Sequence, residues 1–137
     1  MLTGCGSKGA QQSVDAAPQA TETPIDVDLS AMSGTVCYAQ VFDMLQSPDN
    51  YTGQTVRMTG TLSYYQDPNT LKEYFAVVIA DATACCAQGI EFDWAGEHTW
   101  PQDYPALDSE VTVTGTFDTY TEDGYLYVQL KDAQLQV

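Results

Sequence analysis

The sequence has few basic residues and no long hydrophobic run. Four lysines and arginines and one histidine stand against 19 aspartates and glutamates, giving a formal net charge of −15 at pH 7. Because a phosphate backbone demands clustered Lys and Arg, we expect no nucleic-acid partner. No stretch is long and apolar enough to cross a membrane as a helix. The acidity is typical of a solvated, outward-facing surface and would also suit a cationic partner.

Motifs for catalysis are equally scarce. His98 is the only histidine, and one isolated histidine cannot complete a Ser-His-Asp arrangement. The sequence has no phosphate-binding loop, no dinucleotide-binding glycine motif and no Cys-X-X-Cys pair. We therefore expect a protein without enzymatic activity.

The N-terminal residues indicate a membrane tether. Leu2-Thr3-Gly4-Cys5 resembles the bacterial lipobox, in which a signal peptide is cut before the cysteine and the cysteine is lipidated. The resemblance implies that residues 1–5 are a signal-peptide remnant and that Cys5 carries the lipid, although the usual basic and apolar regions of a signal peptide are missing. Residues 6–33 are rich in Gln, Ala, Thr, Ser, Asp and Pro, and they predict a disordered tether. We expect a lipid-anchored protein on the outer face of the bacterial cytoplasmic membrane.

Residues 34–137 have the length of one folded domain. Apolar residues at helical spacing predict a helix over 35–46, with Cys37, Val41, Met44 and Leu45 on one face and Cys37 directed toward the core. The pattern then alternates with period two, which is typical of strands with one buried face. The predicted strands are 56–65, 74–80, 89–94, 110–120 and 125–130, and Glu122-Asp-Gly124 predicts a tight hairpin turn.

Two of these strands contain matching glycines. Val56-Arg-Met-Thr-Gly60 corresponds to Val111-Thr-Val-Thr-Gly115, and a glycine inside a strand indicates a bulge or a bend. The strand order, the two glycines and the stretch from Pro48 to Gly60 resemble bacterial OB-fold domains. This resemblance implies an all-β fold with a small α contribution, a five-stranded OB-like β-barrel with one N-terminal helix. An OB-fold usually has a helix between its third and fourth strands, but residues 95–109 have no helical period and predict an ordered loop, pinned by Trp100 and Tyr104.

The four cysteines leave several hypotheses open. If Cys5 is lipidated, three remain, two of them adjacent at Cys85 and Cys86. A disulfide from Cys37 to either of the pair would fasten the helix to the sheet. Alternation counted back from the strand at 89–94 predicts that Cys86 points inward. The other hypotheses are buried thiols without chemistry, and a strained vicinal disulfide or redox pair.

A metal site is the remaining hypothesis for the cysteines. Cys37, Cys85, Cys86 and His98 would form a Cys₃His set suited to zinc or another metal, although their spacing matches no zinc-finger pattern. The stretch from Ala80 to Ala87 is similar to the Cys-Cys-Ala segment of an uncharacterised bacterial domain of unknown function that is sometimes linked to metal uptake. The whole chain resembles uncharacterised lipoproteins of Gram-positive anaerobes.

Carboxylates and aromatic side chains give two further candidate sites. Glu91 and Asp93 share the outward face of one strand and could bind a hard cation. Aromatic residues could form a ligand face, as OB-folds often use one for extended ligands; the candidates are Trp94, Trp100, Tyr104, Tyr125 and Tyr127. We expect a binding or interaction module at the cell surface, with a protein, peptide or small-ligand partner. The alternative is a metal-handling or thiol-redox protein that uses Cys85 and Cys86.

Overall fold

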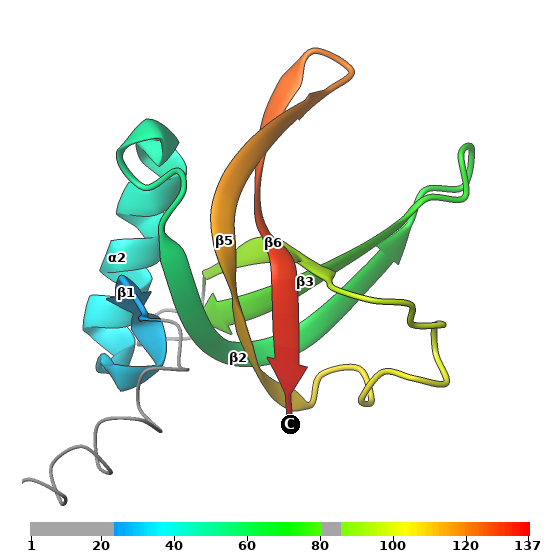
Figure 1. Ribbon diagram of the computed structural model, residues 1–137, viewed down its shortest axis with the longest axis horizontal. Helices are drawn as coiled ribbons and strands as arrows, with labels where there is room; N and C mark the ends of the chain where they lie inside the picture. Colours follow the sequence, from blue (N-terminus) through cyan, green and yellow to red (C-terminus); the bar gives the residue numbers. More distant parts are fainter. Residues whose placement is uncertain (1–23, 81–85) are drawn as a thin grey trace, which may run out of the picture.

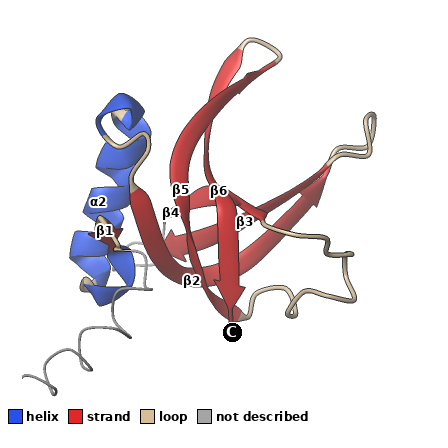
Figure 2. Cartoon of the chain, in the orientation of Figure 1, coloured by secondary structure: helices blue, strands red, loops and turns tan. Residues whose placement is uncertain are grey.

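The computed structural model describes residues 24–80 and 86–137, and in them the chain is mostly β (Figures 1 and 2). One α-helix lies among these residues, with two short 3-10 turns. In chain order the elements are β1 Val27–Asp28, η1 Leu29–Ala31, α2 Gly34–Gln46, η2 Pro48–Asn50, β2 Thr55–Gln66, β3 Glu73–Ala80, β4 Ala87–Trp94, β5 Glu110–Glu122 and β6 Tyr125–Gln136. The expected mostly-β fold with one N-terminal helix is therefore confirmed, with a short sixth strand that the sequence analysis missed.

The strands form one mixed sheet in the order β1-β2-β3-β4-β6-β5. A further antiparallel pairing joins β5 to β2, so the pairings of the five long strands close into a cycle. Two pairings are parallel, β1 with β2 and β4 with β6, and the others are antiparallel. As Figure 1 shows, the β5–β6 hairpin and the β2–β3 hairpin both extend beyond the rest of the sheet.

β2 and β5 are long because each changes its pairing partners along its length. β2 pairs with β5 over residues 55–61 and with β3 over residues 61–66, and Gly60 lies where the partner changes. A Cβ at Gly60 would lie 2.5 Å from the Val78 carbonyl oxygen, so only glycine permits this close approach. The close approach of β3 thus explains why a glycine stands at this position of β2.

β6 runs six residues beyond its predicted end at Leu130. The register against β5 shifts between Thr114 and Thr116, and the extra residue on β6 is Asp132, whose φ is +51°. After this β-bulge the side chain of Ala133 is fully buried, and the strand continues to Gln136. The polar pair Lys131-Asp132 interrupted the alternation, which is why the sequence pattern ended too early.

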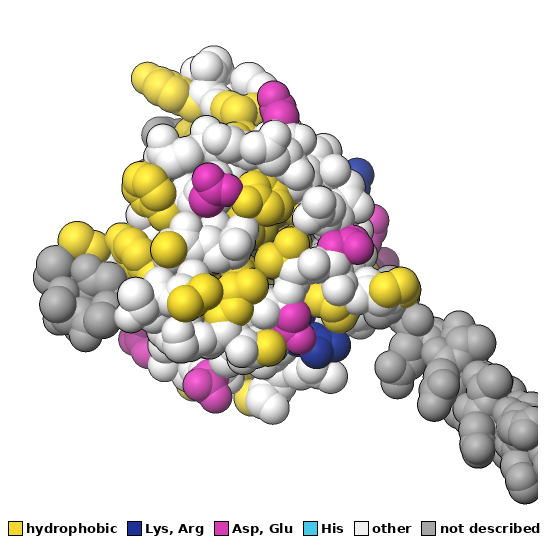
Figure 3. All heavy atoms as spheres, turned by 90° about the vertical axis from the view of Figure 1, so that its left-hand side faces the viewer, with side chains coloured by type: hydrophobic (Ala, Val, Ile, Leu, Met, Phe, Trp, Pro, Cys, Tyr) yellow, Lys and Arg dark blue, Asp and Glu magenta, His cyan; other side chains and the backbone are white. Residues whose placement is uncertain are grey.

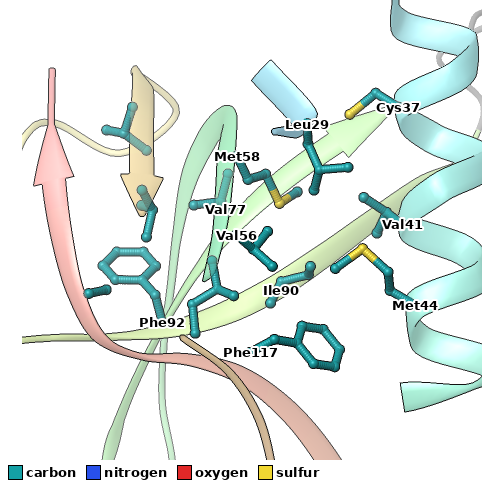
Figure 4. Packing of buried hydrophobic residues seen from close by; sticks show 14 of the residues in the cluster. Leu29, Cys37, Val41, Met44, Val56, Met58, Val77, Ile90, Phe92 and Phe117 are labelled. Carbon is teal, nitrogen blue, oxygen red and sulfur yellow. The ribbon is translucent and has the colours of Figure 1, made fainter. Parts of the chain in front are cut away.

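The core lies between the sheet and α2 (Figure 4). Cys37, Val41 and Met44 point from α2 toward Met58 and Ile90, as the helical spacing predicted. Both Val41 and Met44 are completely inaccessible to solvent. Burial of such side chains contributes roughly 1.5–3 kcal/mol each to stability, so α2 is held to the sheet mainly by this face.

The folded part begins earlier than the expected boundary at residue 34. β1 pairs in parallel with β2, where Val27 lies opposite Val56, and the next residue but one, Leu29, is 1% exposed within the core. Arg57 on β2 also forms an ion pair with Asp28, at 3.2 Å. The overall polar composition of 6–33 concealed one apolar anchor at its C-terminal end. Residues 1–23, with Cys5 and most of the expected tether, lie outside the described residues.

Large apolar side chains are accessible on the surface over α2, as they are at several other places on the molecule. Val36 and Phe42 are about half exposed on this helix, and Figure 3 shows hydrophobic side chains spread among polar groups on this face. None of the helices in the described part of the chain is both long and apolar enough to span a membrane.

Candidate functional site

The outward faces of β3 and β4 carry polar and aromatic side chains that the core does not use. Val77 on β3 and Ile90 and Phe92 on β4 are buried, and the residues that alternate with them point away from the core. Glu91 and Asp93 lie on this outward face, as the alternation predicted. β5 and β6 add Tyr120, Glu122, Tyr127 and Gln129 beside them.

Two adjoining hollows include the side chains of this outward face, and we call them together the outer groove. The first hollow also reaches Phe75 and Phe92, which pack in or against the core. The first has a volume of about 470 Å³ and extends to the loop after β4, and the second has a volume of about 420 Å³ and extends toward the two protruding hairpins. Tyr74, Glu91 and Tyr120 line both hollows and mark the middle of the groove. The outer groove is therefore a continuous surface feature built from five strands, since β2 contributes Ser63 and Tyr65.

A lysine and two carboxylates connect the strands across the middle of the groove. The Lys72 ammonium group lies 2.9 Å from a carboxylate oxygen of Glu122, and the Tyr74 hydroxyl donates to the other oxygen at 2.7 Å. The Tyr120 hydroxyl donates to Glu91 at 2.6 Å. The Lys72 ammonium also lies over two aromatic rings, 5.0 Å from the centre of Tyr74 and 5.5 Å from that of Tyr120. These distances are typical of cation–π contacts.

The surroundings shift the pKa values of the groove residues in opposite directions. Burial raises the pKa of Glu91, although the Tyr120 hydroxyl and Lys72 partly oppose the shift. Hydrogen bonds from Tyr74 and Lys72 lower the pKa of Glu122. Burial and the bond to Glu91 raise the pKa of Tyr120, and the bond to Glu122 raises that of Tyr74. Both tyrosines thus stay protonated at neutral pH and act as hydrogen-bond donors.

Aromatic rings form the far end of the first hollow. His98 stacks on Trp94 with ring centres 3.5 Å apart, and its Nε2 donates to the Ala95 carbonyl oxygen at 2.8 Å. Tyr104 stacks on Phe75 at 4.3 Å, and Trp100 stacks on Tyr64 at the same distance. The loop 95–109 contains no helix and is fixed to the sheet by these rings, as the sequence predicted.

The structure separates the predicted aromatic ligand face into two groups. Trp94 and Tyr104 line the first hollow, and Tyr127 lines the second. Trp100 and Tyr125 line neither hollow: Trp100 lies in the loop 95–109 and stacks on Tyr64 of β2, and Tyr125 is 68% exposed at the tip of the β5–β6 hairpin. Three of the five candidates therefore lie in one groove, at its two ends.

The cysteines do not meet in the described part of the chain. Cys37 is a buried thiol on the core-facing side of α2, and burial raises its pKa. Cys86 is exposed just before β4 begins, so the inward orientation predicted for it is wrong, because the strand alternation does not extend that far. Cys85 lies outside the described residues, so a bond that involves it stays a prediction.

Metal binding is not supported where the structure describes the chain. In residues 24–80 and 86–137, no three His, Cys, Asp or Glu side chains are arranged to hold a metal ion. His98 stacks on Trp94 at the first hollow, whereas Cys37 is buried in the core on α2. Glu91 and Asp93 line the groove, but Glu91 accepts a hydrogen bond from Tyr120.

Sequence reasoning missed the residues in the middle of the groove, which are Lys72, Tyr74, Tyr120 and Glu122. Lys72 and Glu122 are 50 positions apart and are joined only by the fold. One signal was available in the sequence. Lys72 is one of only three lysines and arginines after position 34, and it directly precedes β3, whose second residue is the outward-facing Tyr74.

The groove presents hydrogen-bond acceptors and ring faces, and its one ammonium group is already engaged. Carboxylate oxygens and the electron-rich faces of tyrosine attract cationic groups, particularly where burial removes competing water. The arrangement is thus chemically suited to bind a positively charged, partly apolar chain.

Comparison with known proteins supports the fold and leaves the family open. No protein-family model matches the sequence, and no curated protein matches it. A solved structure of a proposed nucleic acid-binding lipoprotein from Klebsiella pneumoniae is similar, with a TM-score of 0.50 and 13% sequence identity. The match covers 90% of this chain and 97% of the other, and it shows that a lipoprotein shares this overall fold.

The comparison contradicts the expectation that nucleic acid is not a partner. A protein with a similar fold is named for nucleic-acid binding, so the low number of basic residues alone does not justify the exclusion. The charge argument considered only the phosphate backbone, whereas aromatic stacking also contributes to the binding of single strands. We therefore withdraw the exclusion.

Proposed function

We propose that this chain is a membrane-anchored, extracytoplasmic binding module without enzymatic activity, and that its outer groove holds an extended, positively charged peptide segment. The outer groove carries the proposal, because it combines carboxylates and tyrosine rings across five strands. The net charge of −15 would draw a cationic chain toward this surface.

We infer that the five long strands form an OB-like barrel. Their pairings close into a cycle, β2 and β5 each pair with two other long strands, and Gly60 allows a close approach where β2 changes partner. The loop 95–109 takes the place of the helix that such folds usually carry. In OB-folds extended ligands commonly cross an outer strand face between protruding loops, and the outer groove has a corresponding position.

We further propose that Cys5 carries the lipid anchor and that the domain lies on the outer face of the bacterial cytoplasmic membrane. The lipobox-like Leu2-Thr3-Gly4-Cys5 supports this, as does the likeness in fold to a named lipoprotein. In a bacterium that makes the protein with a signal peptide, Cys5→Ser should move it from the membrane fraction to the soluble fraction. Retention of the serine variant in the membrane fraction would overturn this proposal.

Binding can be tested with the tryptophan that lines the groove. Trp94 and Trp100 are the only tryptophans, so Trp100→Phe leaves Trp94 as the single reporter. We would titrate this variant of the full chain with hexalysine, a hexamer of N-acetylglucosamine and a thymidine hexanucleotide. The proposal expects a saturable change in fluorescence with hexalysine. A response only to the saccharide or the nucleotide would overturn it and identify the other ligand class.

A matched pair of variants shows whether hexalysine binds in the groove. Glu91→Gln neutralises a carboxylate in the middle of the groove. Asp49→Asn neutralises a carboxylate on η2, which follows α2 and does not line the groove. The groove variant should weaken hexalysine binding by about three- to tenfold, and the control by less than twofold. Equal weakening would indicate attraction to the overall charge without a defined site.

A further inference from the structure

The side chain of Lys72 lies in an environment that fits a bound ligand better than an ordinary surface lysine. Its ammonium group contacts the Glu122 carboxylate at 2.9 Å and lies over the rings of Tyr74 and Tyr120. Proteins that recognise alkylammonium ligands surround them with aromatic rings and a carboxylate in this manner. Here the ammonium group comes from the chain itself.

The groups around Lys72 are fixed without its help. The Tyr74 hydroxyl holds Glu122 at 2.7 Å, and the Tyr120 hydroxyl holds Glu91 at 2.6 Å. Tyr120 also stacks on Tyr127 of β6, with ring centres 5.4 Å apart. If Lys72 moved away, two carboxylates and two tyrosine rings would therefore remain arranged around the vacated position.

Lys72 itself is held weakly and can leave. Half of its side chain is exposed, and it lies at the end of the β2–β3 hairpin loop, outside the strand. A half-exposed lysine loses side-chain freedom when it is held in an ion pair, and water screens the attraction. An incoming ammonium group could replace it at little cost, because the lysine would return to water.

We propose that Lys72 occupies, from within the same chain, a subsite that recognises the alkylammonium group of a lysine side chain in a bound basic peptide, and that the peptide must displace it. This inference rests on the proposed function. It adds that the group recognised is an alkylammonium group, and that Lys72 occupies the subsite when no peptide is bound. The peptide's lysine would contact Glu122 and the rings of Tyr74 and Tyr120, while Lys72 moves to solvent.

The test compares two lysine variants that carry the same change in charge. Lys72→Gln removes the internal ammonium group from the subsite. Lys131→Gln removes the ammonium group of the ion pair with Asp118, which is 3.4 Å long and lies outside the outer groove. Both are made in the full chain with Trp100→Phe and titrated with hexalysine and with hexalysine whose side chains are acetylated.

We expect Lys72→Gln to bind hexalysine roughly three- to tenfold more tightly than Lys131→Gln does, because only the first change empties the subsite. Acetylation should abolish this gain, because it removes the ammonium charge and leaves the chain length almost unchanged. An equal affinity of the two variants, or a gain that survives acetylation, would overturn the inference while the proposed function stands. A failure of every variant to bind hexalysine would overturn both.

Discussion

Cys37 illustrates how packing controls a side chain that has reactive chemistry. The thiol is 7% exposed among Leu29, Val41 and Met44, and burial disfavours its thiolate form, which is the nucleophile. We expect iodoacetamide to modify Cys37 slowly in the folded protein and quickly after unfolding in denaturant. Peptide mapping by mass spectrometry measures both rates.

The same experiment tests the disulfide that the sequence suggested. If Cys37 reacts after unfolding only when a reductant is also present, it is bonded to another cysteine, and the account of a buried thiol is wrong. Cys85 would then be the partner to examine first, because it lies outside the described residues.

Glu91 should give the stability of the domain a measurable pH dependence. Because burial raises its pKa in the folded state, the folded protein holds this proton more tightly than the unfolded chain does. The free energy of unfolding should therefore fall as the pH rises from the usual glutamate pKa through the higher folded value. Glu91→Gln removes this fall and can still accept a hydrogen bond from Tyr120.

Urea unfolding of the wild type and Glu91→Gln from about pH 3 to about pH 7, which extends below and above the usual glutamate pKa, checks this sign. The free energy of unfolding of the variant minus that of the wild type should increase as the pH rises. Glu122→Gln provides a control of opposite sign, because the pKa of Glu122 is lowered and its stabilisation is lost on acidification, below the usual glutamate pKa. Parallel pH curves for the wild type and Glu91→Gln would contradict the prediction.

At the scale of the elements, the close approach at Gly60 is essential to β2. A Cβ there would lie 2.5 Å from the Val78 carbonyl oxygen and 2.9 Å from a methyl group of Val77, and both are anchored in β3. Gly60→Ala should destabilise the domain by about 1–3 kcal/mol, because the two strands must move apart. Thermal or urea unfolding measures the loss.

Gly34 at the start of α2 is the matched control for Gly60. A Cβ at Gly34 would have no atom within 4 Å, and alanine favours helices over glycine by about 1 kcal/mol. Gly34→Ala should therefore leave the stability unchanged or raise it slightly. If both variants lose the same stability, the close contact at Gly60 is not the cause.

The short segment before α2 should contribute to stability more than its composition indicates. Leu29 is 1% exposed, and removal of most of its side chain would leave a cavity against the sheet. Leu29→Ala should cost about 2–5 kcal/mol of unfolding free energy. Val137→Ala is the control, since Val137 is 94% exposed. If Leu29→Ala destabilises the domain no more than the control does, residues 27–31 belong to the tether and not to the folded domain.

Local patterns in the sequence predicted the elements well, and they failed where an element depends on distant residues. Helical spacing identified α2 and its buried face, and the Asp123-Gly124 turn follows because both residues adopt positive φ. β1 was missed because a two-residue strand has no period to detect. The extension of β6 was missed because its bulge at Asp132 reverses the alternation.

The outer groove was predicted only in part, for a related reason. Alternation along one strand placed Glu91 and Asp93 outward together. The pairing of Lys72 with Glu122 and of Tyr120 with Glu91 depends on which strands become neighbours. The order β4-β6-β5, with β5 returning to β2, is not encoded in any single segment.

At the scale of the whole molecule, charge should control how the domain meets a basic partner. The net charge of −15 and the partly exposed groove carboxylates imply that salt weakens binding. Raising NaCl from about 0.05 M to about 0.5 M should weaken hexalysine binding by roughly tenfold or more. Titration of the Trp94 reporter at each salt concentration measures the change. Affinity that does not depend on salt would contradict a charge-based site.

The closed cycle of strand pairings also limits how such domains can meet one another. Each of the five long strands has neighbours on both sides over part of its length, and the outermost strand, β1, offers only two residues. A strand from another molecule therefore has few unpaired backbone groups with which it could extend the sheet. Such edge-to-edge pairing is a common route to aggregation. Many copies at a high local concentration could thus stay separate, and recognition would depend on their side chains.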